Sequence, residues 1–437
     1  MSVIAPAADT AVGAAPARWS AAALFTVGFL GVTAGIQMSD RGLQAILLSA
    51  IQDSFVVGDA TIGALQGLAG VLVGSAIAVP LARLADRISR KRVLVGLIVG
   101  WTVLMVVSAL APSFPLFFIG RAAAGVTEFA MIPIVYSMIP DLAPERHRVL
   151  ANLSFAALMA AGASAGFYFG EAIVRAGALV FAFDLEPWRK AMLLLSVSGL
   201  PLVLLALLTR DPPRQFASAD AGGSAVALAP FLRERWQAVG LFVGVAGSLM
   251  IAVQALNPLI TLALERRFDA DLGTVGHAMG LVTLVTSIGC LPVAGLLDKA
   301  LGRRFGLAAR PLIMGTGAVA AIPCAALLMV AADVDGALIA VALFLFLTCT
   351  ANALVPTMLQ DLTPPTLRAR SFAIWSFVVS IFCAIGPLVA GTLSDLWLDG
   401  RLLTAIAVTA IPALALSAAC AVRSVISARR TATALPA

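Results

Sequence analysis

The chain is poor in charged residues and in polar aromatic residues. Of its 437 residues only 12% are charged, and it has two histidines and two tyrosines, whereas 61% are hydrophobic and the mean hydropathy is +1.01. A soluble domain could not cover so much apolar surface with polar groups. Because no residues show metal-ligand spacing and histidine is scarce, neither an enzyme nor a metal site is expected. The composition predicts an integral membrane protein.

Cysteine is also scarce, and the amino terminus carries few charges. The five cysteines lie in apolar runs of the second half, which predicts packing residues and not a disulfide framework. They are Cys290, Cys324, Cys349, Cys383 and Cys420. The first 17 residues contain no lysine or arginine and two prolines, so we interpret residues 1–18 as a tail and not as a cleaved signal peptide.

Long apolar runs are what the chain has in abundance. Twelve are long enough to cross a bilayer, which predicts an all-α fold with twelve transmembrane helices. They lie near residues 20–50, 61–84, 93–111, 115–140, 149–174, 190–209, 237–264, 274–297, 310–330, 336–360, 370–394 and 402–423.

Lysines and arginines are distributed unevenly between the two sides of these runs. With the amino terminus inside, inner segments hold 21 of the 29 Lys and Arg residues, outer segments hold six, and two are intramembrane. The six outer bases are Arg175, Arg189, Lys190, Arg266, Arg267 and Arg401. The positive-inside rule then places both termini in the cytoplasm, which predicts a multi-pass protein of the plasma (bacterial inner) membrane. The net charge of +6 reflects this asymmetry and does not indicate nucleic-acid binding.

A charge pattern recurs in the two halves of the chain. One acid followed by several bases occurs at Asp86–Arg92 after the second run and at Asp298–Arg304 after the eighth. Asp141–Arg148 after the fourth run is echoed by Asp361–Arg370 after the tenth. Such a parallel repeat predicts two six-helix bundles with a substrate site between them near the bilayer midplane.

The repeat sets the expected domain boundaries. A stretch rich in Ala, Ser and Gly after the sixth run is interpreted as a pliable linker. The predicted parts are a cytoplasmic tail 1–18, a first bundle 19–210, a cytoplasmic linker 211–235, a second bundle 236–423 and a cytoplasmic tail 424–437.

The repeated acids suggest a latch on the cytoplasmic side. Asp86 would face the start of helix 11, where the helix dipole favours a carboxylate, and Asp298 would face the start of helix 5. We predict that these contacts hold that side shut and break when it opens. The full predicted latch is Asp86, Arg87, Arg90, Asp298 and Arg303. The alternative is that the bases only orient the protein in the membrane.

Four charged residues fall within the predicted spans of the first half. Asp40 and Arg41 in helix 1, and Arg121 and Glu128 in helix 4, lie at neighbouring depths when each residue adds 1.5 Å of rise. Each charge at a helix centre costs roughly 2.5–3.5 kcal/mol on insertion scales, so such residues normally pair and line a cavity. Plausible pairs are Asp40 with Arg121 and Arg41 with Glu128. A static ion network is the structural alternative.

The functional hypothesis gives these charges separate roles. We predict proton coupling by Glu128 and Asp40, because burial and a nearby arginine act on a carboxylate in opposite directions and both change as a cavity opens. Substrate would contact Arg41, Arg121 and Glu128. The second half offers uncharged partners, Gln254 and Asn257, among apolar residues. This asymmetry predicts a substrate with an ionic head and an apolar body.

These residues resemble the major facilitator superfamily, and within it the Spinster branch. The likeness rests on the Asp86–Arg92 loop, Asp40-Arg41, Arg121 to Glu128 with Pro133, Trp188-Arg189, and Gly386-Pro387 followed by Gly391 to Asp395. The chain departs from the pattern at Ala82 and Ser89, where glycines are usual, in one extra residue between Asp298 and Arg303, and at Phe129, where an alanine is common.

The resemblance implies that the helix-1 Asp-Arg pair and the helix-4 Arg and Glu line the central cavity and serve substrate binding and proton coupling. Animal members move lysolipids or sphingosine phosphate. The expected function is therefore proton-coupled transport of an amphiphilic organic anion, such as a lysolipid or sphingolipid-like molecule, by alternating access. We expect a monomer that contacts its substrate and membrane lipids, with no cofactor beyond the proton gradient. The alternatives are a broad-specificity exporter of drugs or organic solutes, and a receptor or scaffold that does not transport.

Overall fold

Helices account for nearly all of the described structure. The computed structural model describes residues 19–77, 81, 88–144, 147–209, 225–364 and 367–433, and every statement below concerns these residues. In the first half the elements are α1 (Ala21–Ile46), α2 (Leu48–Phe55), α3 (Asp59–Ala64), the π-helix η1 (Leu65–Val73), α5 (Arg90–Ala109), α6 (Phe114–Leu142), α7 (Arg148–Tyr168), α8 (Gly170–Val180), α9 (Pro187–Val197) and α10 (Gly199–Leu208). The second half contains α11 (Ala225–Glu234), α12 (Trp236–Leu256), α13 (Ile260–Phe268), α14 (Leu272–Phe305), the 3-10 turn η3 (Gly306–Ala308), α15 (Ala309–Val330), α16 (Val334–Asn352), α17 (Val355–Leu362), α18 (Arg368–Trp397) and α19 (Leu402–Thr433).

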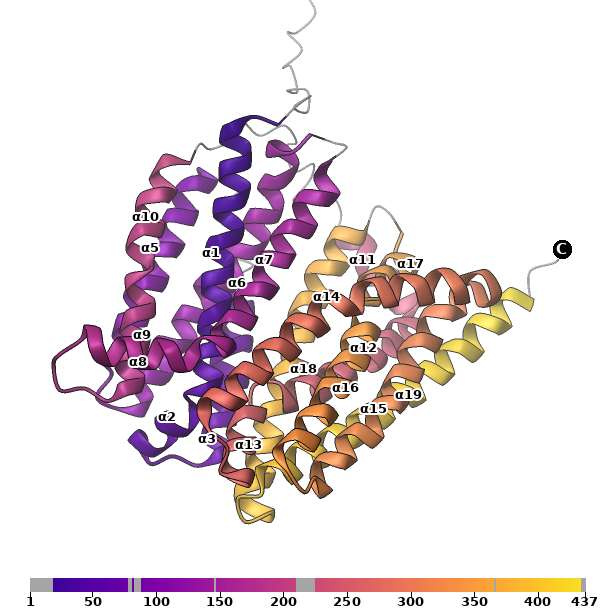
Figure 1. The fold of residues 1–437 in the computed structure, drawn as a ribbon. Coiled ribbons are helices and arrows are strands. Elements are labelled where there is room, and N and C mark those ends of the chain that lie inside the picture. The colour runs from indigo at the N-terminus through magenta and orange to yellow at the C-terminus, as the bar shows by residue number, and fades with distance from the viewer. Residues whose placement is uncertain are drawn as a thin grey trace, which may run out of the picture.

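The predicted membrane crossings are present. Eleven helical runs of the described residues are long and apolar enough to span a bilayer, and one of them, of 59 residues, contains both α14 and α15. Counting that run as two gives twelve crossings, as the sequence predicts. The structure is therefore an all-α membrane protein of two helical halves, which lie side by side in Figure 1.

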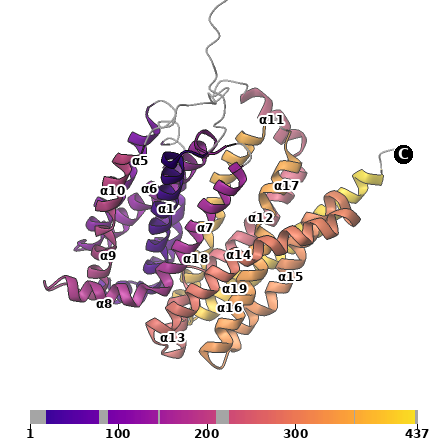
Figure 2. The same cartoon turned by 45° about the horizontal axis from the view of Figure 1, so that its top comes forward.

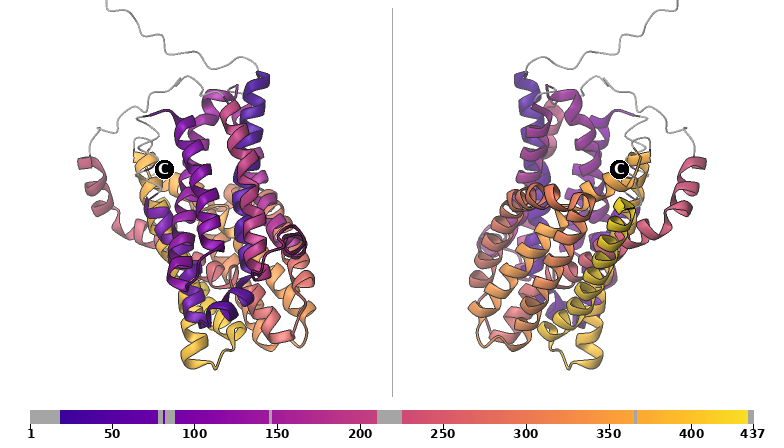
Figure 3. Two further views of the ribbon diagram at one scale, coloured as in Figure 1. Left: turned by 90° about the vertical axis from the view of Figure 1, so that its left-hand side faces the viewer. Right: turned by 90° about the vertical axis from the view of Figure 1, so that its right-hand side faces the viewer.

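The two halves meet at one end and diverge at the other. We call the end with the start of α1 and the end of α10 the linker side, and the end with α2 and α13 the distal side. Figure 1 shows the helices of both halves running between these two sides, with the halves closest on the distal side. Figure 3 shows the same helices from the side of each half. One buried apolar cluster crosses from Leu43 and Ile51 in the first half to Leu256 and Ile260 in the second. A second cluster, around Ile139 and Phe155, is confined to the linker-side part of the first half.

Hydrogen bonds join the halves near the distal side. The Ser164 hydroxyl of α7 donates to the Gly280 carbonyl of α14 at 2.7 Å. The Thr261 hydroxyl of α13 donates to the Ala45 carbonyl of α1 at 2.6 Å. Each of these hydrogen bonds gives a buried backbone carbonyl a partner from the other half. The contact between the halves on the distal side is therefore specific as well as apolar.

Two glycines fix the position of the charged segment of α1. A methyl group at Gly162 or Gly166 of α7 would overlap the backbone of Gly35 or Ser39 in α1. The two helices therefore touch backbone to backbone, as small residues spaced four apart allow. Because Ser39 lies against α7, the next residues along α1 are turned toward α6.

Several predicted single helices are broken into two. The first run divides at Leu47, and the tenth divides between α16 and α17. The break in the seventh, between α12 and α13, falls at Pro258, where the missing N–H removes a helical hydrogen bond. Pro387 lies inside α18, which continues from Arg368 to Trp397.

The linker and the carboxyl-terminal tail contain helix. Figure 2 shows α11 on the linker side of the second half, next to α17. Phe231 of α11 is buried there, with 8% of its surface exposed. The final helix, α19, continues to Thr433 and so runs ten residues past the predicted end of the second bundle at 423. The tail 1–18 and most of the linker lie outside the described residues.

Candidate functional site

A cavity of about 240 Å³ lies between the two halves. Its lining combines charged residues of the first half with uncharged polar residues of the second. The side chains and backbone around it come from Met38, Arg41, Gly42, Gln44, Ala45, Gln66, Val71, Arg121, Gly125, Glu128, Ala163, Phe167, Gln254, Asn257, Pro258 and Thr283. Five residues predicted from the sequence to bind substrate therefore share one cavity: Arg41, Arg121, Glu128, Gln254 and Asn257.

An ion pair joins α1 to α6 at the cavity wall. The Arg41 Nε donates to the Glu128 Oε2 at 2.9 Å. The Arg41 side chain is 33% exposed and that of Glu128 only 2%, so the guanidinium is the accessible member of the pair. The Phe129 ring lies 4.6 Å from the guanidinium carbon and adds a cation–π contact. The second oxygen of Glu128, Oε1, is buried without a hydrogen-bond partner in the described structure.

A second ion pair lies deeper in the first half. The Arg121 Nη1 donates to the Asp40 Oδ2 at 2.8 Å, and the Arg121 Nη2 donates to the Gln44 Oε1 at 2.9 Å. Asp40 and Arg121 are 1% and 5% exposed. Asp40 does not line the cavity; it lies behind Arg121 and holds it by charge. Both pairs that the sequence made plausible are thus present.

The second half contributes hydrogen-bonding groups without charge. Gln254 and Asn257 come from the end of α12, where Pro258 interrupts the helix. Thr283 of α14 completes this wall, and its hydroxyl is buried without a hydrogen-bond partner in the described structure. The arrangement can bind an anion at Arg41 and donate hydrogen bonds from the opposite side.

The structure describes only part of the predicted cytoplasmic latch. Asp86 and Arg87 lie outside the described residues. Arg90 donates to the Asp141 carboxylate at 2.5 Å and to the Ser137 carbonyl at 2.9 Å, which ties α5 to α6 within the first half.

Asp298 contacts residues of its own half in this arrangement, in which the linker-side ends are apart. Asp298 was expected to face the start of helix 5, but the Arg310 Nε donates to it at 3.0 Å, and Arg310 also bonds Asp361. These three residues belong to the second half, so this acid holds one half together and does not bridge the two in this arrangement. Arg303 is exposed at the end of α14. The physical reason is that the halves diverge on the linker side.

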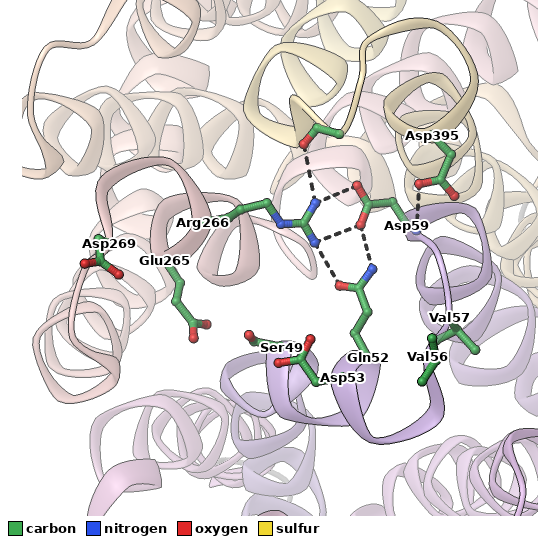
Figure 4. Close-up of a pocket in the computed structure, with 11 residues that line it drawn as sticks. Ser49, Gln52, Asp53, Val56, Val57, Asp59, Glu265, Arg266, Asp269 and Asp395 are labelled. Atoms are coloured by element: carbon green, nitrogen blue, oxygen red, sulfur yellow. Dashed lines mark hydrogen bonds and ion pairs between the residues drawn. The ribbon is translucent and has the colours of Figure 1, made fainter.

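A network that the sequence reasoning missed bridges the halves on the distal side. Figure 4 shows Asp59, at the start of α3, facing Arg266 of α13. The Arg266 guanidinium donates to both Asp59 oxygens, at 2.9 and 3.0 Å. Gln52 donates to Asp59 at 3.0 Å and accepts from Arg266 at 2.8 Å. Such a two-pronged arginine–carboxylate pair is strong and directional.

Asp395 and Ser394 of α18 complete this network. The Asp395 carboxylate accepts the backbone N–H groups of Asp59 and Ala60 at 2.9 and 2.8 Å, and so caps the first turn of α3 from the other half. The Ser394 hydroxyl donates to Asp59 at 2.6 Å. We call Gln52, Asp59, Arg266, Ser394 and Asp395 the distal latch. One signal in the sequence could have revealed this network. Arg266 is an arginine on the predicted outer side, where lysine and arginine are disfavoured.

The fold and this cavity define a class of protein. Two six-helix bundles with a polar site between them, near the middle of the membrane, are the architecture of a secondary transporter. No group of three His, Cys, Asp or Glu residues in the described ranges is placed to hold a metal ion.

Comparison with known proteins gives the family. The profile of the Major Facilitator Superfamily matches residues 30–351 and, in a second match, 245–434, so the chain belongs to this superfamily. It is 27% identical over 388 residues to an MFS-type efflux pump of Mycolicibacterium smegmatis, with 84% of each chain covered. It is 24% identical over 390 residues to Protein spinster of Drosophila melanogaster, covering 85% of this chain and 62% of that protein.

Solved structures show the same fold. A bacterial homologue of the human lysosomal transporter Spinster, in an inward-facing and unoccupied conformation, matches with a TM-score of 0.77 at 19% identity, covering 94% of this chain and 98% of that one. The nucleoside transporter NupG matches with a TM-score of 0.68 at 14% identity, covering 94% and 100%. The protein is thus a transporter of this superfamily with Spinster-like relatives.

Proposed function

We propose that this protein moves an amphiphilic organic anion across the membrane by alternating access, coupled to protons. The observation that carries the proposal is the Arg41–Glu128 ion pair at the wall of a cavity between the two halves. Its guanidinium is accessible from the cavity, whereas its carboxylate is buried with one oxygen unpartnered. A buried carboxylate in this position has two alternative partners, the arginine or a proton.

Coupling follows from this competition. When Glu128 takes up a proton it loses the charge that holds Arg41, and the guanidinium is released from the pair toward an anionic substrate. When the substrate leaves, Glu128 ionises and restores the pair. Asp40 keeps Arg121 in place beside this exchange, because a carboxylate and a guanidinium at 2.8 Å in a buried site restrain each other strongly. In this proposal Asp40 acts on coupling through Arg121.

Alternating access would use the two ends of the molecule. With the linker side cytoplasmic, as the positive-inside rule predicts, the distal latch closes the outer face and the arrangement is inward-facing. Outward opening requires Asp59 and Arg266 to separate and the linker-side ends to close. The Asp86 region and Asp298 are then available for the contacts that the sequence predicts, because the halves approach each other on that side.

The cavity favours a ligand with an anionic head. Arg41 offers charge on one wall, and Gln254, Asn257 and Thr283 offer hydrogen bonds on the other. An apolar body would then follow the apolar helices toward the linker side. We place the protein in the bacterial inner membrane as a monomer with both termini cytoplasmic.

A second candidate function is the export of drugs or other organic solutes with broad specificity. The similarity to an MFS-type efflux pump over 84% of both chains favours it. The two candidates differ in what they demand of Arg41: an anion carrier needs the guanidinium for binding, whereas an exporter of organic cations needs the carboxylate of Glu128.

The test is transport by the purified protein in liposomes. Lysophosphatidylglycerol serves as the anionic probe and ethidium as the cationic probe, and an enclosed dye reports proton movement. For the anion carrier we expect proton movement driven by lysophosphatidylglycerol that is lost in Glu128→Gln and in Arg41→Gln. Glu171→Gln is the matched control, because Glu171 pairs with Arg175 outside the cavity. Ethidium movement that survives Arg41→Gln would support the exporter, and anion uptake by Glu128→Gln with unchanged pH dependence would refute proton coupling through this residue.

A further inference from the structure

A second cavity, of about 340 Å³, lies at the distal end of the second half and is rich in arginine. It is lined by the end of α13, the end of α15 and the start of α19. The lining residues are Ala263, Arg266, Arg267, Leu328, Met329, Gly400, Arg401, Leu402, Leu403 and Thr404. Three arginines face this space, and its described lining contains no carboxylate.

Two of these arginines lack a compensating charge. Arg266 is committed to Asp59 across the distal latch. The Arg401 Nε donates only to the Leu398 carbonyl, at 3.2 Å, and Arg267 is exposed. Neither forms an ion pair with any residue that the structure describes. Arg267 and Arg401 therefore give the cavity a positively charged lining, which a bound anion would offset.

The placement of these bases is unusual for a membrane protein. Of the six bases predicted to be outside, Arg175 pairs with Glu171, and Arg189 pairs with Glu186 at 2.6 Å and donates to two backbone carbonyls. Those contacts with the protein explain why Arg175 and Arg189 lie on the predicted outer side. Arg267 and Arg401 form no such ion pairs with the described residues, and a ligand outside the chain would supply them.

A helix start adds to the same anion-binding potential. The first N–H groups of a helix have no partner within it and carry the positive end of its dipole. The cavity includes Leu403 and Thr404, in the first turn of the 32-residue α19. Arginine side chains and helix starts are the two devices that proteins use most for phosphate groups.

Apolar surface borders the arginines on the α15 side. Leu328 and Met329 line the cavity, and Leu327, Met329 and Val330 are 52%, 41% and 74% exposed. These residues end a membrane-spanning helix, so the arginines lie at the depth of lipid headgroups and the apolar side chains at the depth of the acyl chains.

We propose that Arg267 and Arg401, together with the start of α19, bind the phosphate group of an anionic ligand on the distal face. This site is separate from the transport cavity and does not depend on the proposed substrate. A phosphate group could belong to an anionic phospholipid of the outer leaflet or to inorganic phosphate in solution. The apolar border fits a lipid phosphodiester, whose headgroup would lie against the guanidiniums and whose chains would follow α15.

The experiment has one arm for each source and uses the full-length purified protein. In the first arm, native mass spectrometry counts phosphatidylglycerol retained by protein released from vesicles that also contain phosphatidylcholine. In the second arm, thermal unfolding is followed with increasing inorganic phosphate at constant ionic strength. We expect one of the two arms to show saturable binding that is about tenfold weaker in the Arg267→Gln/Arg401→Gln variant, since each guanidinium supplies a charge-assisted bond.

The controls separate this site from general charge effects. Arg175→Gln removes another exposed distal arginine that has its own partner, so it should bind as the wild type does. Arg267→Lys/Arg401→Lys keeps the charges and should retain most of the binding. If the double glutamine variant does not fold, each single variant is measured in the same way. Equal binding by the wild type and the glutamine variants in both arms, or no binding by the wild type in either, would overturn the proposal.

Discussion

The two halves of this transporter share one topology but contribute different chemistry to the cavity between them. The first half supplies two ion pairs, the partly exposed Arg41–Glu128 and the buried Arg121–Asp40. The second half supplies Gln254, Asn257 and Thr283, none of them charged. Charge in a membrane interior is costly and must be compensated, so it is concentrated where pairs can form within one rigid bundle. The first half therefore holds the charged groups at the cavity, while the second forms an uncharged polar wall.

The distal side reverses this arrangement. There an arginine of the second half, Arg266, reaches a carboxylate of the first, Asp59. Movement of the halves does not by itself separate an ion pair within one half, whereas it must separate an ion pair between the halves. The same type of bond thus stabilises the cavity in one place and a conformation in the other.

The largest expected effect comes from leaving a charge of the first half without its partner. Arg121→Met removes the ion-pair partner of Asp40, which is 1% exposed, and should lower the free energy of unfolding by about 3–5 kcal/mol. Chemical unfolding in detergent measures this. The double variant Asp40→Leu/Arg121→Met should recover most of the loss, because no buried charge then remains unpaired. A single variant as stable as the wild type would show that Asp40 is compensated elsewhere.

The next effect should come from the pair between the halves. Arg266→Gln removes the two bonds to Asp59 and should shift the population toward the distal-open state by about tenfold, since each charge-assisted bond is present only in the closed state. Spin labels at Leu110 and Trp397, both exposed distal residues, report the separation. Asp59→Asn should give a similar shift and the double variant little more. An unchanged distance distribution would mean that apolar contacts alone close this side.

A smaller effect is expected on the neutral wall. Asn257→Ala and Gln254→Ala each remove hydrogen bonds worth about 0.5–1.5 kcal/mol, so substrate affinity should fall roughly two- to tenfold. The pH dependence of transport should not move, because neither side chain titrates. Transport titrations at several pH values test both statements. A changed pH profile in either variant would place the second half in the coupling machinery and remove the contrast between the halves.

The smallest effect concerns Glu265, an acid of the second half near the distal latch. Burial raises the pKa of Glu265, and the negative charge of Asp53 in the first half raises it further. The distal-closed state therefore favours protonated Glu265. The stability of that state is highest at low pH and declines as the pH rises through the raised pKa of Glu265. Glu265→Gln should flatten this pH dependence. Because the Glu265 side chain is partly exposed, we expect a change of only about twofold in the ratio of distal-closed to distal-open molecules. Distances between the spin labels at Leu110 and Trp397, measured across pH, test this. They would show the opposite pH dependence if ionised Glu265 instead stabilised the distal-closed state.

Local composition was enough to predict much of the fold. Runs of about twenty apolar residues predicted the membrane-spanning helices. The repeated charge motifs predicted two related halves. Depth along α1 and α6 made both ion pairs of the first half plausible, since a fixed rise per residue converts sequence distance into membrane depth.

The distal latch was not predictable in this way. Asp59 and Arg266 are 207 positions apart and come from different halves, and each by itself resembles an ordinary charged residue at a helix end. The same holds for Gln44 and Gln66, whose places at the cavity depend on how α1 and η1 face α6. The contact of Asp298 with Arg310 in this arrangement was not predicted either, because sequence does not reveal whether the halves approach or separate on the linker side.

The order of amino acids is enough to show that this protein spans the membrane, that its halves are related, and that one of them holds charge at lipid depth, because hydrophobic length and the cost of burying charge are local properties. The tertiary structure was needed to show which charges meet, which end of the molecule is closed, and that two bases on the distal side share one cavity. Those features depend on the packing of helices from opposite halves, and no local rule specifies that packing.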